Sequence, residues 1–202
     1  MAGHQYDKEL HGIKISFPPA SLEFIKSVYA KSKNILEYGS GGSTALALEG
    51  DVERIVSVES DKEWAQDLKR TLSKHYERDR FLIHHANIGP TKNWGYPDGL
   101  ESFRRFHLYP NQIWDLIGDW HPDTVLIDGR FRKACFCTTM LRIKKPVTVL
   151  LDDYIDRPNY HGIEKFSKPV EIVDRVARFE LEPQALPAEH LTEIIAAYSH
   201  TR

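Results

Sequence analysis

This sequence has little of what disulfide-bonded, zinc-binding or membrane-spanning proteins need. Among its 202 residues only two are cysteines, Cys135 and Cys137, which stand two positions apart. On the helix expected there they face different directions, so they cannot share a disulfide or a metal, and we assign both to the core or its boundary. The ten histidines show no His-x-x-x-His or paired Cys/His spacing, so a zinc site is not expected.

Long apolar runs and a strong net charge are missing as well. Apolar stretches such as 147–151 are far too short to span a bilayer. Residues 1–9 lack the apolar core of a signal peptide. A net charge of −2 leaves no general basic footprint for nucleic acid. We therefore expect a cytoplasmic protein whose partner is a small molecule, with neither a membrane nor a nucleic acid as partner.

The composition is that of a soluble globular domain, with 41% apolar and 28% charged residues. We assign residues 1–202 to a single domain, because this length suffices for one sizeable core. Residues 1–33 are expected to form an N-terminal arm and helix. Residues 88–122 carry repeated turn signals, among them Tyr109-Pro110-Asn111, and are expected to be an insertion that recognises the acceptor.

Short apolar strands alternate with helical patterns along the chain. The strands are expected at 34–37, 54–60, 81–87, 123–129 and 147–151, with 170–173 and 177–181 as a closing antiparallel pair. Ser60-Asp61-Lys62-Glu63 fits a capping box with Ser60 as the N-cap of the helix after the second strand. This alternation predicts an α/β fold, a doubly wound and mostly parallel seven-stranded sheet covered on both faces. Such sheets bind ligands outside the carboxyl ends of their strands.

The stretch from Asn34 to Thr44 is a strand, a glycine turn and a helix start in immediate succession. Gly39 and Gly41 allow a ligand to approach the backbone closely, because glycine has no side chain. The helix start directs free N–H groups toward the same place. Glu59 ends the next strand about 20 residues further on, the spacing at which a carboxylate meets the ribose hydroxyls of a nucleotide-type cofactor.

The turn is not a dinucleotide turn as it stands. Gly39-x-Gly41 begins the G-x-G-x-x-G pattern, but Thr44 occupies the position of the third glycine, which allows close helix–strand packing in dinucleotide-binding folds. A nicotinamide-dependent oxidoreductase with a degenerate turn is therefore an alternative that Thr44 and Glu37 disfavour.

The segment Glu37-Tyr38-Gly39-Ser40-Gly41 resembles the E/D-x-G-x-G motif of class I S-adenosylmethionine-dependent methyltransferases. The resemblance implies that the turn closes on the methionine end of the cofactor, that Glu59 binds the ribose hydroxyls, and that the end of the third strand lies near the adenine. The expected cofactor-binding residues are Glu37, Tyr38, Gly39, Ser40, Gly41, Ser43, Thr44, Glu59, Ser60, Ala86, Asn87 and Asp128. A module that binds S-adenosylmethionine without turnover is a further alternative.

The acids after the fourth and fifth strands extend the resemblance. Asp128 and Asp152-Asp153 match, by position, acids of the catechol and caffeoyl-CoA O-methyltransferase branch, in which an Asp and an Asp-Asn pair hold a divalent metal. Here the pair is Asp-Asp, and the segment 130–132, Arg-Phe-Arg, replaces the lysine of that branch. A metal is therefore not favoured. We expect Asp128 to contact the methionine end of the cofactor or the acceptor, and Asp153 to serve as a base in O-methylation.

Basic side chains flank the acid of the fourth strand on both sides, and they are Arg104, Arg105, His107, Arg130 and Arg132. If both segments border the cleft, the acceptor carries a carboxylate or a phosphate, which the planar fork of arginine binds in bidentate fashion. The alternative is that these arginines pair with surface acids. The expected catalytic residues are Asp128, Asp153 and Arg130.

Overall fold

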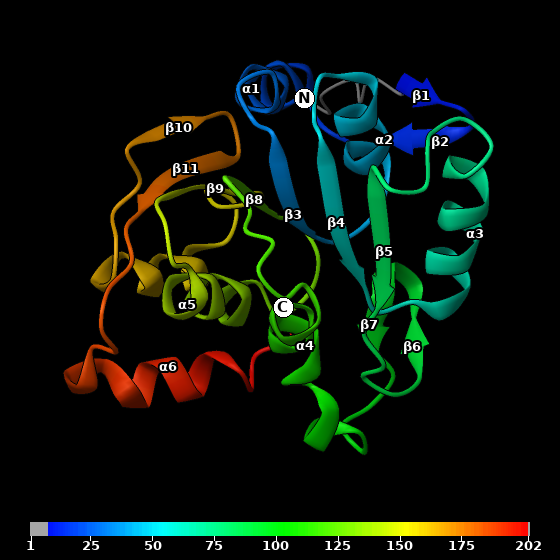
Figure 1. The fold of residues 1–202 in the computed structure, drawn as a ribbon. Coiled ribbons are helices and arrows are strands. Elements are labelled where there is room, and N and C mark those ends of the chain that lie inside the picture. The colour runs from blue at the N-terminus through cyan, green and yellow to red at the C-terminus, as the bar shows by residue number, and fades with distance from the viewer. Residues whose placement is uncertain (1–7, 202) are drawn as a thin grey trace, which may run out of the picture.

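The computed structural model describes residues 8–201, and its centre is a seven-stranded sheet (Figure 1). The strand order is β10-β11-β9-β8-β3-β4-β5. The bounds are β3 Asn34–Tyr38, β4 Arg54–Glu59, β5 Phe81–His85, β8 Thr124–Ile127, β9 Val147–Leu151, β10 Glu171–Val173 and β11 Val176–Leu181. Strands β9, β8, β3, β4 and β5 run parallel, whereas β11 is antiparallel to both β9 and β10. The predicted doubly wound sheet with its antiparallel C-terminal pair is confirmed.

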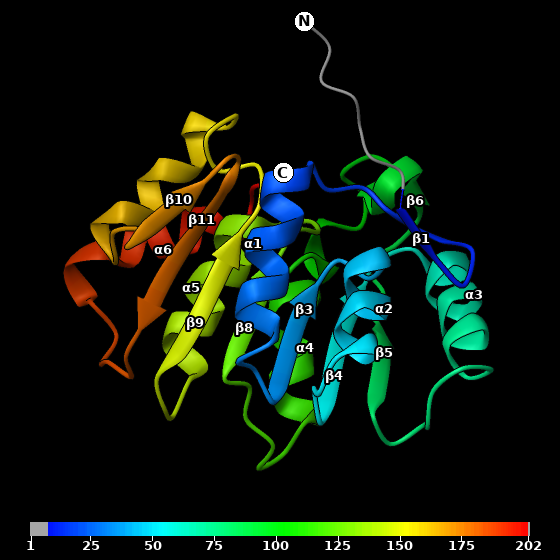
Figure 2. The ribbon, with the colours of Figure 1, turned by 90° about the horizontal axis from the view of Figure 1, so that it is seen from above.

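Helices cover both faces of this sheet, as Figure 2 shows from above. One face carries α1 Pro19–Tyr29, α2 Gly42–Glu49 and α3 Lys62–Leu72, and the other carries α4 Leu108–Leu116, α5 Arg132–Arg142 and α6 Leu191–Ala197. Successive residues of a strand point to opposite faces. Ile35 accordingly lies in the core beneath α1–α3 and Leu36 in the core beneath α4–α6, and both are fully buried.

The remaining elements are short. They are the hairpin β1 Lys8–Leu10 and β2 Ile13–Ile15, the hairpin β6 Thr91–Lys92 and β7 Tyr96–Pro97, and the 3₁₀ helices η1 Asn93–Gly95, η2 Phe103–Arg105, η3 Pro158–Lys165 and η4 Ala188–His190. Cys135 and Cys137 lie on α5 and are free and buried, as predicted. No helix within residues 8–201 combines the length and the apolar run that crossing a bilayer requires.

The segment 88–122 is more regular than its turn signals suggest. Tyr109-Pro110-Asn111 was expected to be a turn, but it lies in the first turn of α4, which makes that prediction wrong. Pro110 is tolerated there because the first N–H groups of a helix have no partner within the helix. Ile113 and Trp114 are buried against the sheet, so burial of an apolar face outweighs the local turn preference.

The N-terminal arm predicted for residues 1–33 falls partly outside the described residues, which begin at residue 8. The described part forms the β1–β2 hairpin and α1, and it buries Ile13, Ile15 and Phe17 in the core beneath α1–α3.

Strand β3 marks the switch point of the sheet. From β3 the chain proceeds to β4 and β5 on one side, and it returns on the other side as β8 and β9. Connections that leave a strand in opposite directions open a crevice at its carboxyl end. The glycine turn after β3, Glu59 at the end of β4 and Asp128 after β8 all lie at this edge.

Helix α3 begins one residue later than the capping box predicted. Its N-cap is Asp61, whose Oδ1 accepts the backbone N–H of Trp64 at 3.0 Å. Ser60 was expected in this position, but its hydroxyl donates to the carbonyl oxygen of Gly95 at 2.8 Å. Ser60 therefore ties the β6–β7 hairpin to the end of β4.

This assignment predicts that Asp61→Ala lowers the free energy of unfolding by about 1 kcal/mol, because the cap hydrogen bond is lost. Asp61→Asn is the matched control, since asparagine caps equally well and should leave stability nearly unchanged. Urea unfolding followed by circular dichroism measures both variants. Equal losses in the two variants would contradict the cap.

Candidate functional site

A cavity of about 560 Å³ opens at the carboxyl ends of β3, β4 and β8. This volume lies within the range of sites for small molecules. Its wall combines six segments of the sequence: Lys14, Ser16 and Phe17; Gly39 to Ser43; Glu59, Ser60, Asp61 and Trp64; Asn93, Trp94 and Gly95; Tyr109; and Asp128, Gly129 and Arg130.

The glycine turn forms the floor of this cavity. Gly39 has φ +100°, and a Cβ there would lie 2.6 Å from the backbone nitrogen of Gly129. A Cβ on Gly42 would lie 2.4 Å from a carbonyl oxygen of β2. Neighbouring backbone atoms therefore leave no room for a side chain at Gly39 or at Gly42. Gly41 differs, because a Cβ there meets nothing closer than 4.0 Å and would occupy cavity space.

Glu37 supports the turn from behind and does not line the cavity. Its carboxylate is fully buried and accepts hydrogen bonds from the hydroxyls of Ser43, Thr44 and Ser57, the last at 2.8 Å. Burial raises the pKa of Glu37 to about 7, although the three hydroxyl hydrogen bonds lower it in part. Thr44 also accepts the N–H of Gly41 at 2.9 Å, so this network fixes the shape of the turn.

Four further residues predicted to bind a cofactor do not line this cavity. Thr44 is fully buried behind the turn, in the network with Glu37. Tyr38 is buried on the α4 side, where its hydroxyl donates to the carbonyl oxygen of Pro110 at 2.7 Å and accepts the Nε1–H of Trp114 at 2.8 Å. Ala86 is buried, and Asn87 is exposed and borders a neighbouring hollow. The structure does bring Gly39, Ser40, Gly41, Ser43, Glu59, Ser60 and Asp128 together on one wall.

Glu59 is the acid that faces the cavity from β4. Its Oε1 accepts the backbone N–H groups of Ser60 at 2.7 Å and Asp61 at 2.9 Å, and its Oε2 accepts that of Ser40 at 3.3 Å. Burial raises the pKa of Glu59, and the three backbone hydrogen bonds oppose this rise. Each oxygen of an ionised carboxylate can accept more than one hydrogen bond, so the group can also accept hydroxyls from a ligand in the cavity.

Two tryptophans, which the sequence did not single out as site residues, border the cavity. Trp64 lies on α3, and its Nε1–H donates to the carbonyl oxygen of Ser40 at 2.8 Å. Trp94 lies on the β6–β7 hairpin with φ +65° and an exposed fraction of 80%. An aromatic side chain this exposed at the rim of a cavity is available to stack on a planar ligand.

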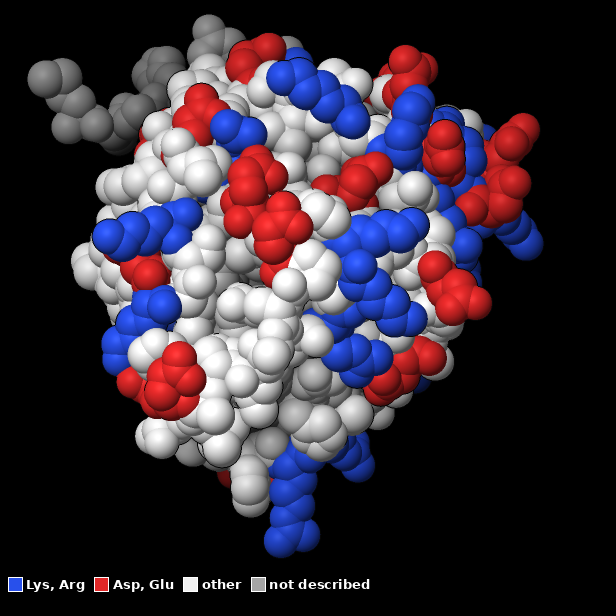
Figure 3. All heavy atoms as spheres, turned by 60° about the vertical axis from the view of Figure 1, so that its left-hand side comes forward, with Lys and Arg blue, Asp and Glu red and all other residues white. Residues whose placement is uncertain are grey.

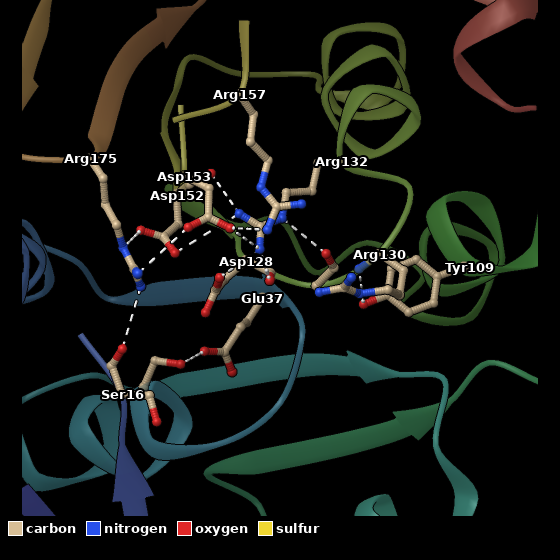
Figure 4. Close-up of polar contacts among 12 residues, drawn as sticks. Ser16, Glu37, Tyr109, Asp128, Arg130, Arg132, Asp152, Asp153, Arg157 and Arg175 are labelled. Carbon is tan, nitrogen blue, oxygen red and sulfur yellow. Dashed lines mark hydrogen bonds and ion pairs between the residues drawn. The ribbon is translucent and has the colours of Figure 1, made fainter. Parts of the chain in front are cut away.

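The guanidinium of Arg132 lies among the three acids that follow β8 and β9 (Figure 4). Its Nη2 lies 3.0 Å from Oδ1 of Asp128 and 3.1 Å from Oδ2 of Asp153, and its Nη1 lies 3.9 Å from Oδ2 of Asp152. It also donates to the backbone carbonyl oxygens of Asp128 and Asp152, each at 2.6 Å. Burial alone would lower the pKa of Arg132, but the carboxylates outweigh burial and raise it.

Two more arginines hold the outer side of this acid cluster. Arg157 Nη2 lies 2.9 Å from Oδ2 of Asp153, and Arg175 Nη1 lies 3.6 Å from Oδ1 of the same residue. Arg175 Nε donates to Oδ1 of Asp152 at 2.8 Å. Asp152 is buried, and its Oδ2 has no hydrogen-bond partner among the described residues. Burial and the neighbouring carboxylate of Asp128 raise the pKa of Asp152.

Of these three acids only Asp128 lines the cavity, and 29% of its side chain is exposed. Asp152 and Asp153 lie behind Asp128, where they are paired with Arg132, Arg157 and Arg175. Within residues 8–201, no group of three or more His, Cys, Asp or Glu residues is arranged to hold a metal ion. The interior position among the acids is taken by the cationic Arg132 side chain.

Arg130 is the arginine that reaches the cavity. It is 8% exposed, and its guanidinium carbon lies 3.9 Å from the centre of the Tyr96 ring. Its backbone N–H donates to the hydroxyl of Tyr109 at 3.3 Å. Arg132 is instead paired with Asp128 and Asp153. The basic residues that the sequence singled out in the 88–122 segment are exposed outside the cavity wall: Arg104, Arg105 and His107.

Sequence reasoning missed several residues of this wall: Lys14, Ser16, Phe17, Gly42, Trp64, Trp94 and Tyr109. Most of them belong to the N-terminal segment that includes β2 and the residues after it, to the β6–β7 hairpin or to α4. Only the three-dimensional packing of these elements brings them to the strand ends. Trp64 lies on α3 and is 42% exposed.

Charged side chains on the face that carries β10 and β11 are mixed in sign. On the face that Figure 3 shows, Lys and Arg are interspersed with Asp and Glu.

Comparison with solved structures identifies similar proteins. A methyltransferase-like protein from Silicibacter pomeroyi is 38% identical, with a TM-score of 0.87 over 95% of this chain and 100% of that chain. An O-methyltransferase from Bacillus cereus, in complex with SAH, is 15% identical, with a TM-score of 0.56 over 82% of each chain. An O-methyltransferase from Streptomyces achromogenes, in complex with SAM, is 14% identical, with a TM-score of 0.54 over 84% of this chain and 83% of that chain. The last two likenesses concern the fold. No protein-family model and no curated protein matches the sequence.

The buried Glu37 predicts a pH-dependent stability. Its pKa is about 7 in the folded protein against an ordinary value of 4.5, so the folded state binds more protons than the unfolded state between these values. Stability contributed by this group is therefore present below about pH 4.5, and it is lost as the pH rises to 7. A shift of this size corresponds to a loss of up to about 3 kcal/mol.

Glu37→Gln removes this titration, so its free energy of unfolding relative to wild type should rise between pH 5 and pH 8. Urea unfolding at four pH values within that range measures the difference. Glu63→Gln, an exposed acid on α3, is the matched control and should run parallel to wild type. Parallel curves for Glu37→Gln as well would contradict the raised pKa.

Proposed function

The chain belongs to the class I S-adenosylmethionine-dependent methyltransferase family, and from this premise we propose that it transfers a methyl group from S-adenosylmethionine to a small-molecule acceptor. Oxygen is the favoured methyl-accepting atom. The observation that carries the proposal is the position of Glu59 on the same cavity wall as the glycine turn. A ribose-binding acid and an open backbone turn at one switch point suit a cofactor with a nucleoside end and an amino-acid end.

The described residues fit such a cofactor. Gly41 leaves space that any side chain would fill, and Glu59 retains acceptor capacity toward the cavity. We assign Glu59 to the ribose hydroxyls and Gly39 to Gly41 to the methionine moiety. The Bacillus cereus and Streptomyces achromogenes proteins were crystallised with SAH and SAM respectively, which agrees with this choice of cofactor.

The cofactor supplies an electrophilic methyl group on a positively charged sulfur. The protein's part is to align the acceptor with that methyl group and to remove the acceptor's proton. Alignment supplies the larger share of the acceleration. A general base adds about 10²–10⁴-fold.

We assign the role of general base, which removes the acceptor's proton, to Asp128. It is the acid of the cluster that lines the cavity, and Arg132 holds its Oδ1 at 3.0 Å. Asp153, expected to be the base, has both oxygens beside guanidinium groups and lies behind the cavity wall. In the proposed mechanism Asp153 positions Arg132, and Arg132 in turn positions Asp128.

The first test concerns the cofactor. Glu59→Ala should weaken the binding of S-adenosylhomocysteine about ten- to hundredfold, because a hydrogen-bonded carboxylate is lost. Calorimetry on the folded variant measures this, with Glu63→Ala as the matched exposed control. Wild type should bind NAD poorly. Unchanged affinity in Glu59→Ala, or preferential binding of NAD, would overturn the assignment.

The second test concerns the acids. Incubation with radiolabelled S-adenosylmethionine and a small-molecule extract, followed by mass spectrometry of the labelled product, identifies the acceptor. Turnover should then fall at least about a hundredfold in Asp128→Asn while S-adenosylhomocysteine still binds. Because Arg132 already neutralises the acids, a chelator should leave turnover unchanged.

Three results would argue against this account. Loss of turnover in chelator with recovery on added Mg²⁺ would assign the acids to a metal. A larger loss in Asp153→Asn than in Asp128→Asn would return the base to Asp153. Cofactor binding without turnover of any acceptor would favour a binding module.

A further inference from the structure

We propose that Arg130 forms an anion-binding subsite in the cavity, and that the methyl acceptor carries a carboxylate or a phosphate bound by this side chain. The inference rests on the proposed function, since it places the acceptor in the same cavity as the cofactor. It narrows the acceptor from any small molecule to an anionic one.

Arg130 is a buried cation whose charge is not matched by an acid. Its side chain lies in the cavity wall with 8% exposure, and its Nε has no hydrogen-bond partner among the described residues. No carboxylate within residues 8–201 lies within 4.0 Å of its guanidinium, whereas Arg132, Arg157 and Arg175 all have such partners. An uncompensated buried charge costs several kcal/mol, which a bound anion offsets.

The guanidinium is also held in one orientation. Its carbon lies 3.9 Å from the centre of the Tyr96 ring, which is the stacked arrangement that arginine forms with aromatic faces. Tyr109 fixes the backbone by accepting the N–H of Arg130 at 3.3 Å. A planar fork held in this way presents its donors to an oxyanion at little entropic cost.

The acid cluster is balanced without Arg130. Its three carboxyl groups, those of Asp128, Asp152 and Asp153, are paired with the guanidinium groups of Arg132, Arg157 and Arg175. Arg130 therefore adds a positive charge that the cluster does not neutralise, and Glu59 and Asp61 are the other acids of the cavity wall. Asp128 also lines the cavity, but its Oδ1 is paired with Arg132, which limits its repulsion of an incoming anion.

The hydroxyl of Tyr96 lies close to the positive charges of Arg130 and Arg157. Burial would raise the pKa of its hydroxyl, but the guanidinium groups of Arg130 and Arg157 outweigh burial and lower it. A phenol in contact with Arg130 is thus already stabilised in its anionic form. A ligand oxyanion at the same guanidinium would be stabilised for the same reason.

The carboxylate of the cofactor is the competing ligand for Arg130, so the experiment has to separate cofactor from acceptor. We would record the arginine Nε–H signals of the ¹⁵N-labelled protein saturated with S-adenosylhomocysteine. The probes are acetate, inorganic phosphate, benzoate and benzamide, the last being the uncharged match of benzoate. The Nε–H signal that is missing from the spectrum of Arg130→Lys, a variant that keeps the positive charge, is the signal of Arg130.

Carboxylates or phosphate should shift the Arg130 Nε–H signal, and benzamide should not. Arg130→Gln should weaken binding of the active anion about tenfold or more, and it should leave the affinity for S-adenosylhomocysteine unchanged. Arg104→Gln, which removes an exposed arginine outside the cavity, should alter neither. A response to phosphate alone or to carboxylates alone decides which group the acceptor carries.

The subsite is wrong if no anion moves the signal, or if benzamide binds as well as benzoate. It is also wrong if Arg130→Gln weakens S-adenosylhomocysteine by the same factor as the anion, because Arg130 then serves the cofactor. If wild type fails to bind S-adenosylhomocysteine at all, the proposed function fails. The anion titration without cofactor still tests Arg130 in that case.

Discussion

The geometry of the cavity edge depends on one buried cation. Arg132 donates to backbone carbonyl oxygens at the ends of both β8 and β9, and it faces Asp128, Asp152 and Asp153 at the same time. Three carboxyl groups this close could not all be ionised without a positive charge among them. A guanidinium supplied by the chain itself meets that requirement and fixes directions as well, because its fork is planar. The side chain of Asp128 keeps its place at the cavity through this contact.

Acids at neighbouring strand ends acquire different tasks from their surroundings. Glu37 and Glu59 lie at the ends of adjacent parallel strands. The carboxylate of Glu37 is enclosed by three hydroxyl donors. The carboxylate of Glu59 accepts three backbone N–H groups and faces the cavity. Hydroxyl donors and full burial make Glu37 a support of the turn. Backbone donors leave Glu59 ionisable and accessible to a ligand. A carboxylate at a strand end therefore indicates the edge of the site, and only its neighbours decide what it does.

The sheet could be predicted from the sequence because each strand carries its own apolar run and the strands alternate with helical patterns. The glycine turn and Glu59 could be placed for a similar reason, since they are local to two consecutive units. Helix α4 was missed because burial of Ile113 and Trp114, a tertiary effect, overrides the turn signal around Pro110. The division of roles among the acids was equally inaccessible. It depends on Arg157, which precedes η3, and on Arg175, which lies in the turn between β10 and β11, and neither belongs to a motif.

The contact between Gly39 and Gly129 joins two loops that the sequence separates by ninety positions. A Cβ on Gly129 would meet the backbone of Gly39 at 2.8 Å and the hydroxyl of Tyr109 at 2.0 Å. Neither glycine can accept a side chain while the other loop keeps its course, and α4 is bound to the same arrangement through Tyr109. The three segments are thus sterically coupled. A chimera that exchanged one of these loops with a relative would have to exchange the other two as a matched set.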